Sequence, residues 1–366
     1  MSKARELAEL GAAYDSGALS NRNIIINGAM QVAQRGTSST GVGSASGYFT
    51  CDRWEVETGN SAGRLTMTQE SDGPDGFANS IKLACTTADT SIASNEYFRL
   101  QQVIEAQNLQ SLAKGSSSAK QFTLSFYVKG NATATYGIEI YDLDNTRHIC
   151  ASFNVTTSWN RISLTFAGDT TGAINDDNGG GFQVGIWLHS GSDYNSGTLA
   201  TSWASVTNAN RSSSSNTSFF DSTSRTFFIT GVQLEVGSEA TPFEHRSFGD
   251  ELHRCQRYYA KIENTTGTGG KYFTQLQAYS SSAMAGALRD YPVTMRTTPT
   301  ATQSGTFGAL QAAAGDAGMA TTIGGLIPTA ISWTSAGWGS GSGLTAGHAS
   351  IVFFNDNAYL AADAEL

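Results

Sequence analysis

The most recognisable catalytic pattern in the sequence is Gly-Asn-Ser-Ala-Gly at residues 59–63, which fits the Gly-x-Ser-x-Gly form of a nucleophile elbow. An elbow needs a strand before the serine and a helix after it, so that the hydroxyl stands exposed on a sharp turn. Here the next residues, RLTMT at 64–68, alternate as a strand does. The sequence therefore predicts a hairpin turn at this point and no acyl-transfer nucleophile.

Metal-binding chemistry has little support in the sequence. No two histidines lie at metal-ligand spacing, and the sequence has no His-Glu-x-x-His motif. The Asp-rich stretches 142–145 and 176–179 carry the oxygen ligands that Ca²⁺ prefers, but neither has the spacing of a calcium loop with a distal Glu. We expect no metal and no cofactor, with a structural Ca²⁺ ion as the alternative to Asp-rich turns that hold nothing.

Enzymatic activity is not indicated either. Glycoside hydrolysis needs two carboxyl groups at a set separation, which a sequence alone cannot reveal, and no motif marks Glu139 or Glu235. The Gly-rich stretches neither lead from a strand into a helix nor carry the Lys-Ser/Thr pair of a phosphate-binding loop. We therefore expect no catalytic residues and no enzyme, and a polysaccharide depolymerase remains the alternative.

Aromatic residues are the remaining chemical signal. Flat rings bind pyranose faces, and amides and carboxylates bind the hydroxyls. Four candidates for ligand binding are Tyr194, Trp187, Trp203 and Trp338. Trp187 is expected on the less buried face of its strand, and Tyr194 and Trp203 lie in a long polar insertion at 189–225, which at this length is typical of a functional or a disordered loop. Packing between subunits is the equally weighted alternative for these rings.

Composition limits the classes of protein to consider. The chain has 366 residues, a length typical of two domains, and only 14% of its residues are charged, with a net charge of −9. No basic run, membrane-length apolar segment or signal-peptide core occurs, so we expect no nucleic-acid partner, no membrane insertion and no Sec export. Four well-separated cysteines favour buried free thiols in a protein assembled in a reducing cytoplasm.

Alternating apolar residues predict the elements that must position these groups. About ten short strands recur between 24 and 236, the clearest at 122–129, where Phe122, Leu124, Phe126 and Val128 share one face. In the strand 226–236 we expect Phe228, Thr230, Val232 and Leu234 on one face. This pattern predicts an antiparallel β-sandwich and resembles the jelly roll of carbohydrate-binding modules. A smaller β-sandwich is expected in the C-terminal part.

Helices are expected at two places. Residues 2–14 predict an N-terminal helix whose narrow apolar stripe consists of Ala4, Leu7, Ala8 and Leu10. So short a helix is marginal alone, and we expect it to anchor the chain in a larger particle or to associate with copies of itself. A second short helix, capped by Ser247, follows the strand 226–236.

Several segments carry a family resemblance. The run GVQLEVGSEATPFEHRSFGDELHRCQRYY at 231–259, NRNIIINGAMQVAQRGTS at 21–38, CDRW at 51–54, YPVTMRTTPT at 291–300 and the ending YLAADAEL resemble tail-fibre and related virion proteins of tailed bacteriophages. The resemblance implies a structural role in a virion, a homotrimer and no catalytic residue. It also implies localisation in the virion after assembly in the host cytoplasm.

The resulting hypothesis has three parts. Residues 1–20 form an anchoring or oligomerising helix and linker, residues 21–247 a jelly-roll β-sandwich, and residues 248–366 a C-terminal β-sandwich. The fold class is mainly β. The predicted function is that of a tail fibre that contributes to recognition of host-surface glycan, with other virion proteins and host polysaccharide as partners, and a capsid-bound fibre or decoration protein is the alternative.

Overall fold

The computed structural model describes Lys3 and residues 21–264, 271–281, 284–311, 315–320, 326–328, 332–335, 344–355 and 357–366. The chain divides into two units, of which the first consists of the residues up to Glu251 together with Leu366, and the second spans Leu252–Glu365. The sequence placed this boundary between residues 247 and 248. The predicted N-terminal helix, with Ala4, Leu7, Ala8 and Leu10, lies outside the described residues.

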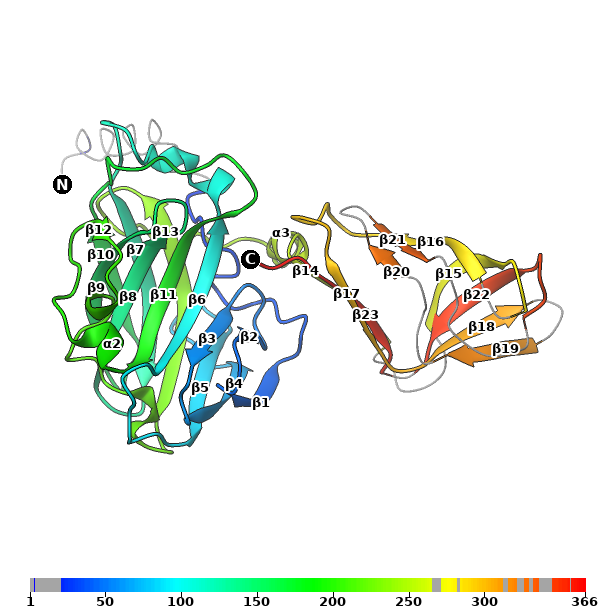
Figure 1. The fold of residues 1–366 in the computed structure, drawn as a ribbon, viewed down its shortest axis with the longest axis horizontal. Coiled ribbons are helices and arrows are strands. Elements are labelled where there is room, and N and C mark those ends of the chain that lie inside the picture. Colours follow the sequence, from blue (N-terminus) through cyan, green and yellow to red (C-terminus); the bar gives the residue numbers. More distant parts are fainter. Residues whose placement is uncertain are drawn as a thin grey trace. The chain divides into compact units, whose positions relative to one another are not determined.

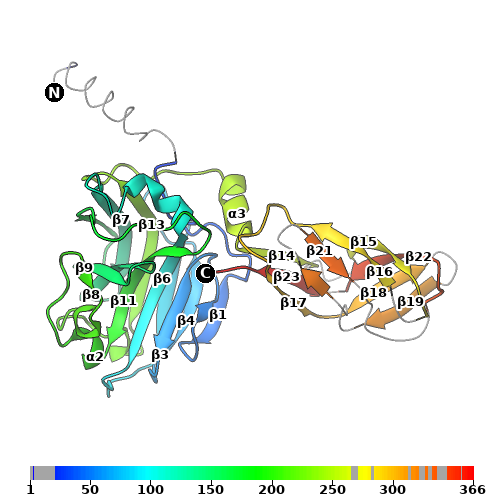
Figure 2. The same ribbon diagram turned by 45° about the horizontal axis from the view of Figure 1, so that its top comes forward.

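The first unit consists of two antiparallel sheets, visible in Figure 1 and Figure 2. Sheet I contains, in spatial order, β1 (Ser38–Val42), β4 (Arg64–Glu70), β5 (Ser80–Thr87), β13 (Thr226–Val236), β7 (Phe122–Gly130) and β10 (Asn160–Phe166). Sheet II contains β12 (Ala204–Ser205), β9 (Arg147–Val155), β8 (Ala134–Asp142), β11 (Gly180–Ser190), β6 (Tyr97–Glu105), β3 (Glu55–Gly59) and β2 (Gly47–Tyr48).

The strand order identifies a jelly roll. Eight strands, β5 to β11 followed by β13, form two sets of four. One set is β5-β13-β7-β10 in sheet I, and the other is β6-β11-β8-β9 in sheet II. Two four-stranded sheets linked in this way are the arrangement of two Greek keys. The apolar rows of both sheets meet in one core, which includes Leu124, Phe126, Ile138 and Val184. The predicted antiparallel β-sandwich is therefore confirmed.

The strand β13 corrects one prediction about which side chains share a face. Phe227, Ile229, Val232 and Leu234 all lie in the core, although the first two alternate out of step with the last two. The register shifts at Gly231, whose φ of +62° suits glycine, and a Cβ there would lie 2.8 Å from the ring of Phe77. The bulge adds one residue, so the core-facing residues are odd-numbered before it and even-numbered after it.

Helical segments in both units are short. Within residues 21–264 they are η1 (Ala106–Leu112), α2 (Ser192–Asn195), η2 (Asn208–Asn210), η3 (Phe219–Asp221) and α3 (Phe248–Gln256). Ser247 caps α3, as predicted, because its Oγ accepts a hydrogen bond from the backbone N of Asp250 at 3.2 Å. Among the described residues, no helix is long and apolar enough to cross a membrane.

The second unit is also built from antiparallel sheets. Sheet III contains β14 (Tyr259–Glu263), β23 (Tyr359–Asp363) and β17 (Thr300–Ser304). Sheet IV contains β19 (Gly315–Ala320), β18 (Phe307–Gln311), β22 (Ala349–Phe354), β15 (Lys271–Ala278), β16 (Met284–Asp290), β21 (Ser332–Ser335) and β20 (Leu326–Pro328). Both sheets contribute to one core, in which Leu360 and Ala362 of sheet III join Phe307 and Phe354 of sheet IV.

Candidate functional site

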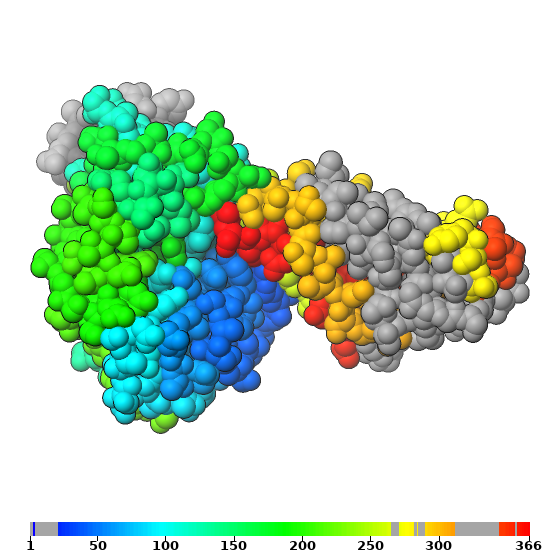
Figure 3. Space-filling view, viewed as in Figure 1, coloured from blue at the N-terminus to red at the C-terminus, as the bar shows by residue number. Residues whose placement is uncertain are grey.

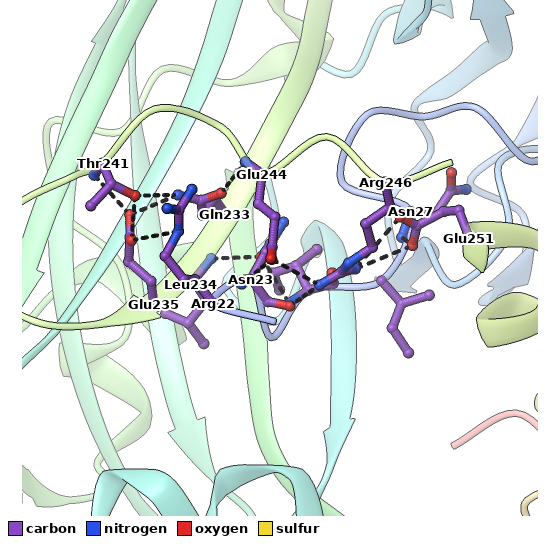
Figure 4. Close-up of polar contacts among 12 residues, drawn as sticks. Arg22, Asn23, Asn27, Gln233, Leu234, Glu235, Thr241, Glu244, Arg246 and Glu251 are labelled. Atoms are coloured by element: carbon purple, nitrogen blue, oxygen red, sulfur yellow. Dashed lines mark hydrogen bonds and ion pairs between the residues drawn. The ribbon is translucent and has the colours of Figure 1, made fainter. Parts of the chain in front are cut away.

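Two segments that are far apart in the sequence interlock in the first unit (Figure 4). Asn23 is buried, and its Nδ2 donates to the backbone oxygen of Val232 at 3.0 Å. Its Oδ1 accepts from the backbone nitrogens of Ile25 at 3.0 Å and Leu234 at 3.1 Å. One amide side chain therefore fixes the start of the described chain against the last strand of the jelly roll.

Charged groups continue this contact toward α3. Glu244 accepts from the backbone N of Asn23 at 2.8 Å, and Glu251 accepts from the backbone N of Asn27 at 2.5 Å. Arg246 lies 3.5 Å from both carboxylates and donates to the backbone oxygen of Asn23. Burial alone would raise the pKa of Glu244, but the backbone N–H of Asn23 and the charge of Arg246 hold the pKa below its ordinary value.

We call these five residues, Asn23, Asn27, Glu244, Arg246 and Glu251, the clasp. The clasp joins 21–38 and 231–259, two of the segments that carry the resemblance to virion proteins. Its charges and amides are occupied by each other and by backbone groups, so it explains why these segments have the residues they have without pointing to a ligand.

At the first Asp-rich stretch, the ammonium group of Lys114 takes the place that a metal cation would occupy. Lys114 is buried, and its Nζ lies 2.6 Å from Asp142 Oδ2 and 3.2 Å from Asp169 Oδ2. The same ammonium donates to the backbone oxygens of Thr171 and Gly172, each at 2.8 Å. Two carboxylates and two carbonyls are the ligands that a Ca²⁺ ion would use, and here the lysine occupies their centre.

The second Asp-rich stretch is an exposed turn. Asp176 and Asp177 are both exposed, and Asp177 Oδ1 accepts from the backbone N of Gly179 at 2.9 Å. This geometry is an ordinary Asx turn. The structural Ca²⁺ alternative at residues 142–145 and 176–179 therefore finds no support in the arrangement of these side chains.

The Gly-x-Ser-x-Gly match is not a hairpin, which corrects that prediction. The strand before it, β3, belongs to sheet II and the strand after it, β4, belongs to sheet I, so residues 60–63 cross between the sheets. Ser61 is buried, and its Oγ bonds to Asp89 Oδ2 at 3.1 Å. The next element is the strand β4 and not a helix, and this absence of a helix is the reason for predicting that Ser61 is no nucleophile.

The insertion at 189–225 is folded onto the outer face of sheet II. Its strand β12 pairs with β9, and Figure 1 shows α2 and β12 beside β8 and β9. In the space-filling view of Figure 3, residues near 200, coloured green, form part of the surface of the first unit. Of the two alternatives for so long a loop, functional or disordered, the structure excludes disorder, because the insertion is a packed cover over part of the sheet.

Beneath this cover lies a buried carboxylate, Glu139. Arg211 of the insertion donates to it from Nε at 2.9 Å and from Nη2 at 2.9 Å, and Arg99 of β6 donates at 3.2 Å. His148 Nδ1 lies 2.9 Å from it, and Trp187 Nε1 donates at 3.0 Å. Burial would raise the pKa of Glu139, but the hydrogen bond with His148 and the charge of Arg211 lower it to about 2.

The structure places the four predicted ligand-binding residues in different environments. Trp187 is fully buried under the insertion, so it cannot meet a ligand, and the expectation of a less buried face is wrong. Trp203 is half-buried, donates to the backbone oxygen of Ala167 at 2.7 Å and packs against the core. Tyr194 is half-buried, with its ring 5.4 Å from that of Trp187. Trp338 lies outside the described residues.

The part of sheet II that the insertion does not cover bears an open groove whose floor is polar. It is lined by Glu55, Glu57, Gln101, Val103, Leu143, Gly180, Gln183 and Leu366, the last of which belongs to the first unit. Gln101 Nε2 donates to Glu55 Oε2 at 2.8 Å, and Gln183 Nε2 donates to Glu57 Oε2 at 3.2 Å. The two amides also bond to each other. These contacts hold the carboxylates and amides in fixed positions on three neighbouring strands.

One edge of the groove continues into the charged network under the insertion. Arg99 pairs with Glu57, and Tyr97 Oη donates to Glu57 Oε1 at 3.3 Å. Leu143 is 39% exposed and supplies an apolar contact at the other edge. The groove therefore combines polar groups in fixed positions with one exposed apolar side chain.

No motif in the sequence indicates this groove. Its polar residues lie on three strands, with Glu55 on β3, Gln101 on β6 and Gln183 on β11. They become neighbours only because Glu55 pairs with Gln101, and Gln183 with Val103, in adjacent strands. The signal that was available is the polar alternation within each strand, as in Glu55-Val56-Glu57. That alternation identifies an outward face but not which outward faces are neighbours.

The four cysteines, Cys51, Cys85, Cys150 and Cys255, are buried thiols that form no disulfide, as their spacing predicts. Burial raises the pKa of the Cys150 thiol, so this sulfur stays protonated beside Glu139.

Comparisons with known proteins add similarities of low degree. No protein-family model and no curated protein matches the sequence. A family 61 carbohydrate-binding module solved with β-1,4-galactotriose is 9% identical, with a TM-score of 0.31 over 60% of this chain and 100% of that chain. A family 11 module from Clostridium thermocellum, solved with a mixed-linked tetrasaccharide, is 12% identical, with a TM-score of 0.28 over 56% and 98%.

A third match is the enzymatically active domain of tailspike protein 4 from bacteriophage CBA120, which is 13% identical with a TM-score of 0.31. The match covers 59% of this chain and 21% of that chain. At TM-scores this low, none of these similarities assigns a family or a function to the chain.

Proposed function

We propose that the chain is a non-enzymatic structural protein of a bacteriophage particle, a tail fibre whose first unit binds host-surface glycan in the groove on sheet II. The observation that carries the glycan part is the fixed row of carboxylates and amides formed by Glu55, Glu57, Gln101 and Gln183. Sugar hydroxyls donate hydrogen bonds, so they are matched by the half-buried carboxylates of Glu55 and Glu57, which accept. The buried amides of Gln101 and Gln183 hold these carboxylates in position.

Binding without cleavage is favoured by the electrostatics of the described carboxyl groups. A general acid for glycoside hydrolysis needs a pKa raised toward neutrality. Glu139 shows the opposite, since its pKa is lowered to about 2. Asp72, Asp89, Asp169 and Glu244 are also shifted downward. These groups are therefore ionised at neutral pH, and none of them has the raised pKa that a general acid needs.

The virion role is supported by the sequence segments that resemble phage fibre proteins, two of which interlock in the clasp. We infer that three copies of the chain assemble, that residues 1–20 attach them to other virion proteins, and that the β units face the host. Deletion of residues 2–14 should leave a folded, β-rich protein that is absent from purified particles. Normal incorporation of the truncated chain, or a stable monomer of the full chain by light scattering at micromolar concentration, would contradict the assembly part.

The glycan part has its own test. Purified full-length protein should co-sediment with capsule or lipopolysaccharide of the host and release no soluble oligosaccharide. Release of oligosaccharide would support the depolymerase alternative. A protein that neither binds nor cleaves these polysaccharides would remove the glycan part while leaving the virion role to be judged by the particle experiment.

A further inference from the structure

A second group of ionisable side chains lies in the first unit, away from the groove and the Glu139 network. Asp89, Glu96 and His189 are 6%, 6% and 0% exposed. One ligand atom from each lies within 4.8 Å of the others. Asp89 follows β5, Glu96 precedes β6, and His189 lies near the end of β11, so the fold brings together groups from distant parts of the sequence.

The charges of this group are not balanced by basic side chains. Within the described part of the chain, neither Asp89 nor Glu96 forms an ion pair with a lysine or an arginine, and the one basic neighbour is His189, whose Nε2 lies 3.3 Å from Glu96 Oε2. Two carboxylates removed from water cost free energy unless a cation or a proton compensates them.

A similar group elsewhere in the same unit shows what compensation looks like. Glu139, His148 and Cys150 also have ligand atoms within 4.8 Å of one another. There, Arg99 and Arg211 neutralise the single carboxylate directly. That group needs no metal, whereas the group at Asp89 has two carboxylates and no guanidinium.

We propose that Asp89, Glu96 and His189 bind one divalent ion of the zinc class. One imidazole nitrogen with two carboxylate oxygens is a ligand set that Zn²⁺ accepts, and three protein ligands leave a fourth position for water. Ca²⁺ and Mg²⁺ favour sites made of oxygen alone, so the imidazole selects against them.

The surrounding hydrogen bonds hold the ligands in place for this role. His189 Nδ1 lies 2.8 Å from Ser218 Oγ, so when Nε2 binds the ion, Nδ1 carries the proton and donates it to the hydroxyl. Asp89 Oδ2 accepts from the backbone N of Ala62 at 2.8 Å and bonds to Ser61 Oγ. His189 and Asp89 are thus each oriented by a second group, as in metal sites generally.

The position of the group gives the ion a structural task. His189 stands where the chain leaves β11 for the insertion, and Ser218 stands on the returning side, next to η3. The backbone oxygen of Phe220 in η3 also accepts from the backbone N of Asp89 at 2.8 Å. An ion here fastens the β5–β6 connection to both ends of the insertion, independently of whether the groove binds glycan.

The test uses tag-free full-length protein that has been stripped with EDTA and titrated with zinc chloride in a calorimeter, with metal content measured by mass spectrometry. We expect one zinc ion per chain, a dissociation constant below about 1 µM and a higher melting temperature with zinc, because the ion binds the folded state. Absence of zinc binding would overturn the proposal, and a proton shared by the carboxylates would then compensate their charge. Tighter binding of calcium than of zinc would overturn the assigned class of ion.

Variants distinguish this site from the group of Glu139, His148 and Cys150, which serves as the control. Glu96→Gln and His189→Gln should each abolish measurable zinc binding, while His148→Gln, in the matched buried group, should retain it. Ser218→Ala leaves all three ligands in place and should weaken zinc binding by about 10- to 100-fold, which keeps the test valid if a ligand variant fails to fold. Loss of zinc binding in His148→Gln with full binding in Ser218→Ala and Glu96→Gln would contradict the assignment.

Discussion

Arg211 Nε lies 2.9 Å from Glu139 Oε1, and this ion pair joins the insertion to β8 of the jelly roll. The pair is buried, since the side chain of Glu139 is 1% exposed and that of Arg211 13%. Because a buried carboxylate depends on its partners, the insertion and the sheet stabilise each other through this one group.

Stability should therefore depend on pH through Glu139. Its pKa is lowered from an ordinary 4.5 to about 2 in the folded protein, so its ionised form stabilises the fold above about pH 4.5, and this contribution is lost as the pH falls toward 2. Glu139→Gln should lower the free energy of unfolding at pH 7 by about 3 to 5 kcal/mol. Urea unfolding at several pH values should show the difference between wild type and variant shrinking between pH 4.5 and 2, and a difference that stays constant over that range would contradict the assignment.

The buried lysine gives a second prediction. Lys114→Met removes the ammonium between Asp142 and Asp169 and leaves Asp142 without its cation, so it should cost about 3 to 5 kcal/mol of stability. Lys129→Met is the matched control, because the Lys129 pair with Asp72 is partly exposed and should contribute less than about 1 kcal/mol. Chemical denaturation compares the two variants, and equal losses would show that the burial of Lys114 has no special effect.

Trp203 gives a third prediction, which differs from the role expected from sequence. Trp203→Ala removes a ring 5.8 Å from that of Phe182 together with a hydrogen bond to Ala167, so it should lower stability by about 1 to 3 kcal/mol. Trp203→Phe keeps a ring and should lose less, and Ile92→Ala, at a side chain 43% exposed, should lose almost nothing. Thermal unfolding measures all three. A Trp203→Ala protein as stable as wild type that adsorbs poorly to cells would instead restore the ligand-binding role.

The strands were predictable because they depend on local pattern. The row Phe122, Leu124, Phe126 and Val128 alternates without interruption, and β7 spans Phe122–Gly130, close to the predicted 122–129. In β13 the ends were predicted, but the face was not, because one residue added at Gly231 inverts the alternation. A glycine inside a strand pattern was the available signal for that bulge.

The candidate sites could not be predicted in the same way, because they depend on contacts between distant segments. Trp187 faces away from the core, so its alternation alone indicates solvent, yet the insertion covers that face and Arg211 lies over its ring. The histidine of the proposed zinc site likewise has no partner at a nearby sequence position, since Asp89 and Glu96 come from another connection. Periodicity reports which face a side chain takes and not what covers that face.

The most direct test of the central claim is calorimetric titration of the full-length protein with oligosaccharides prepared from the host polysaccharide. The double variant Glu55→Ala with Gln183→Leu removes two of the polar groups of the groove and should bind at least about 10-fold more weakly than wild type, which corresponds to roughly 1.4 kcal/mol. Glu70→Ala is the control, because Glu70 lies on β4 in sheet I, and it should bind as wild type does. Unchanged affinity in a folded double variant would contradict the assignment of the groove on sheet II as the glycan site.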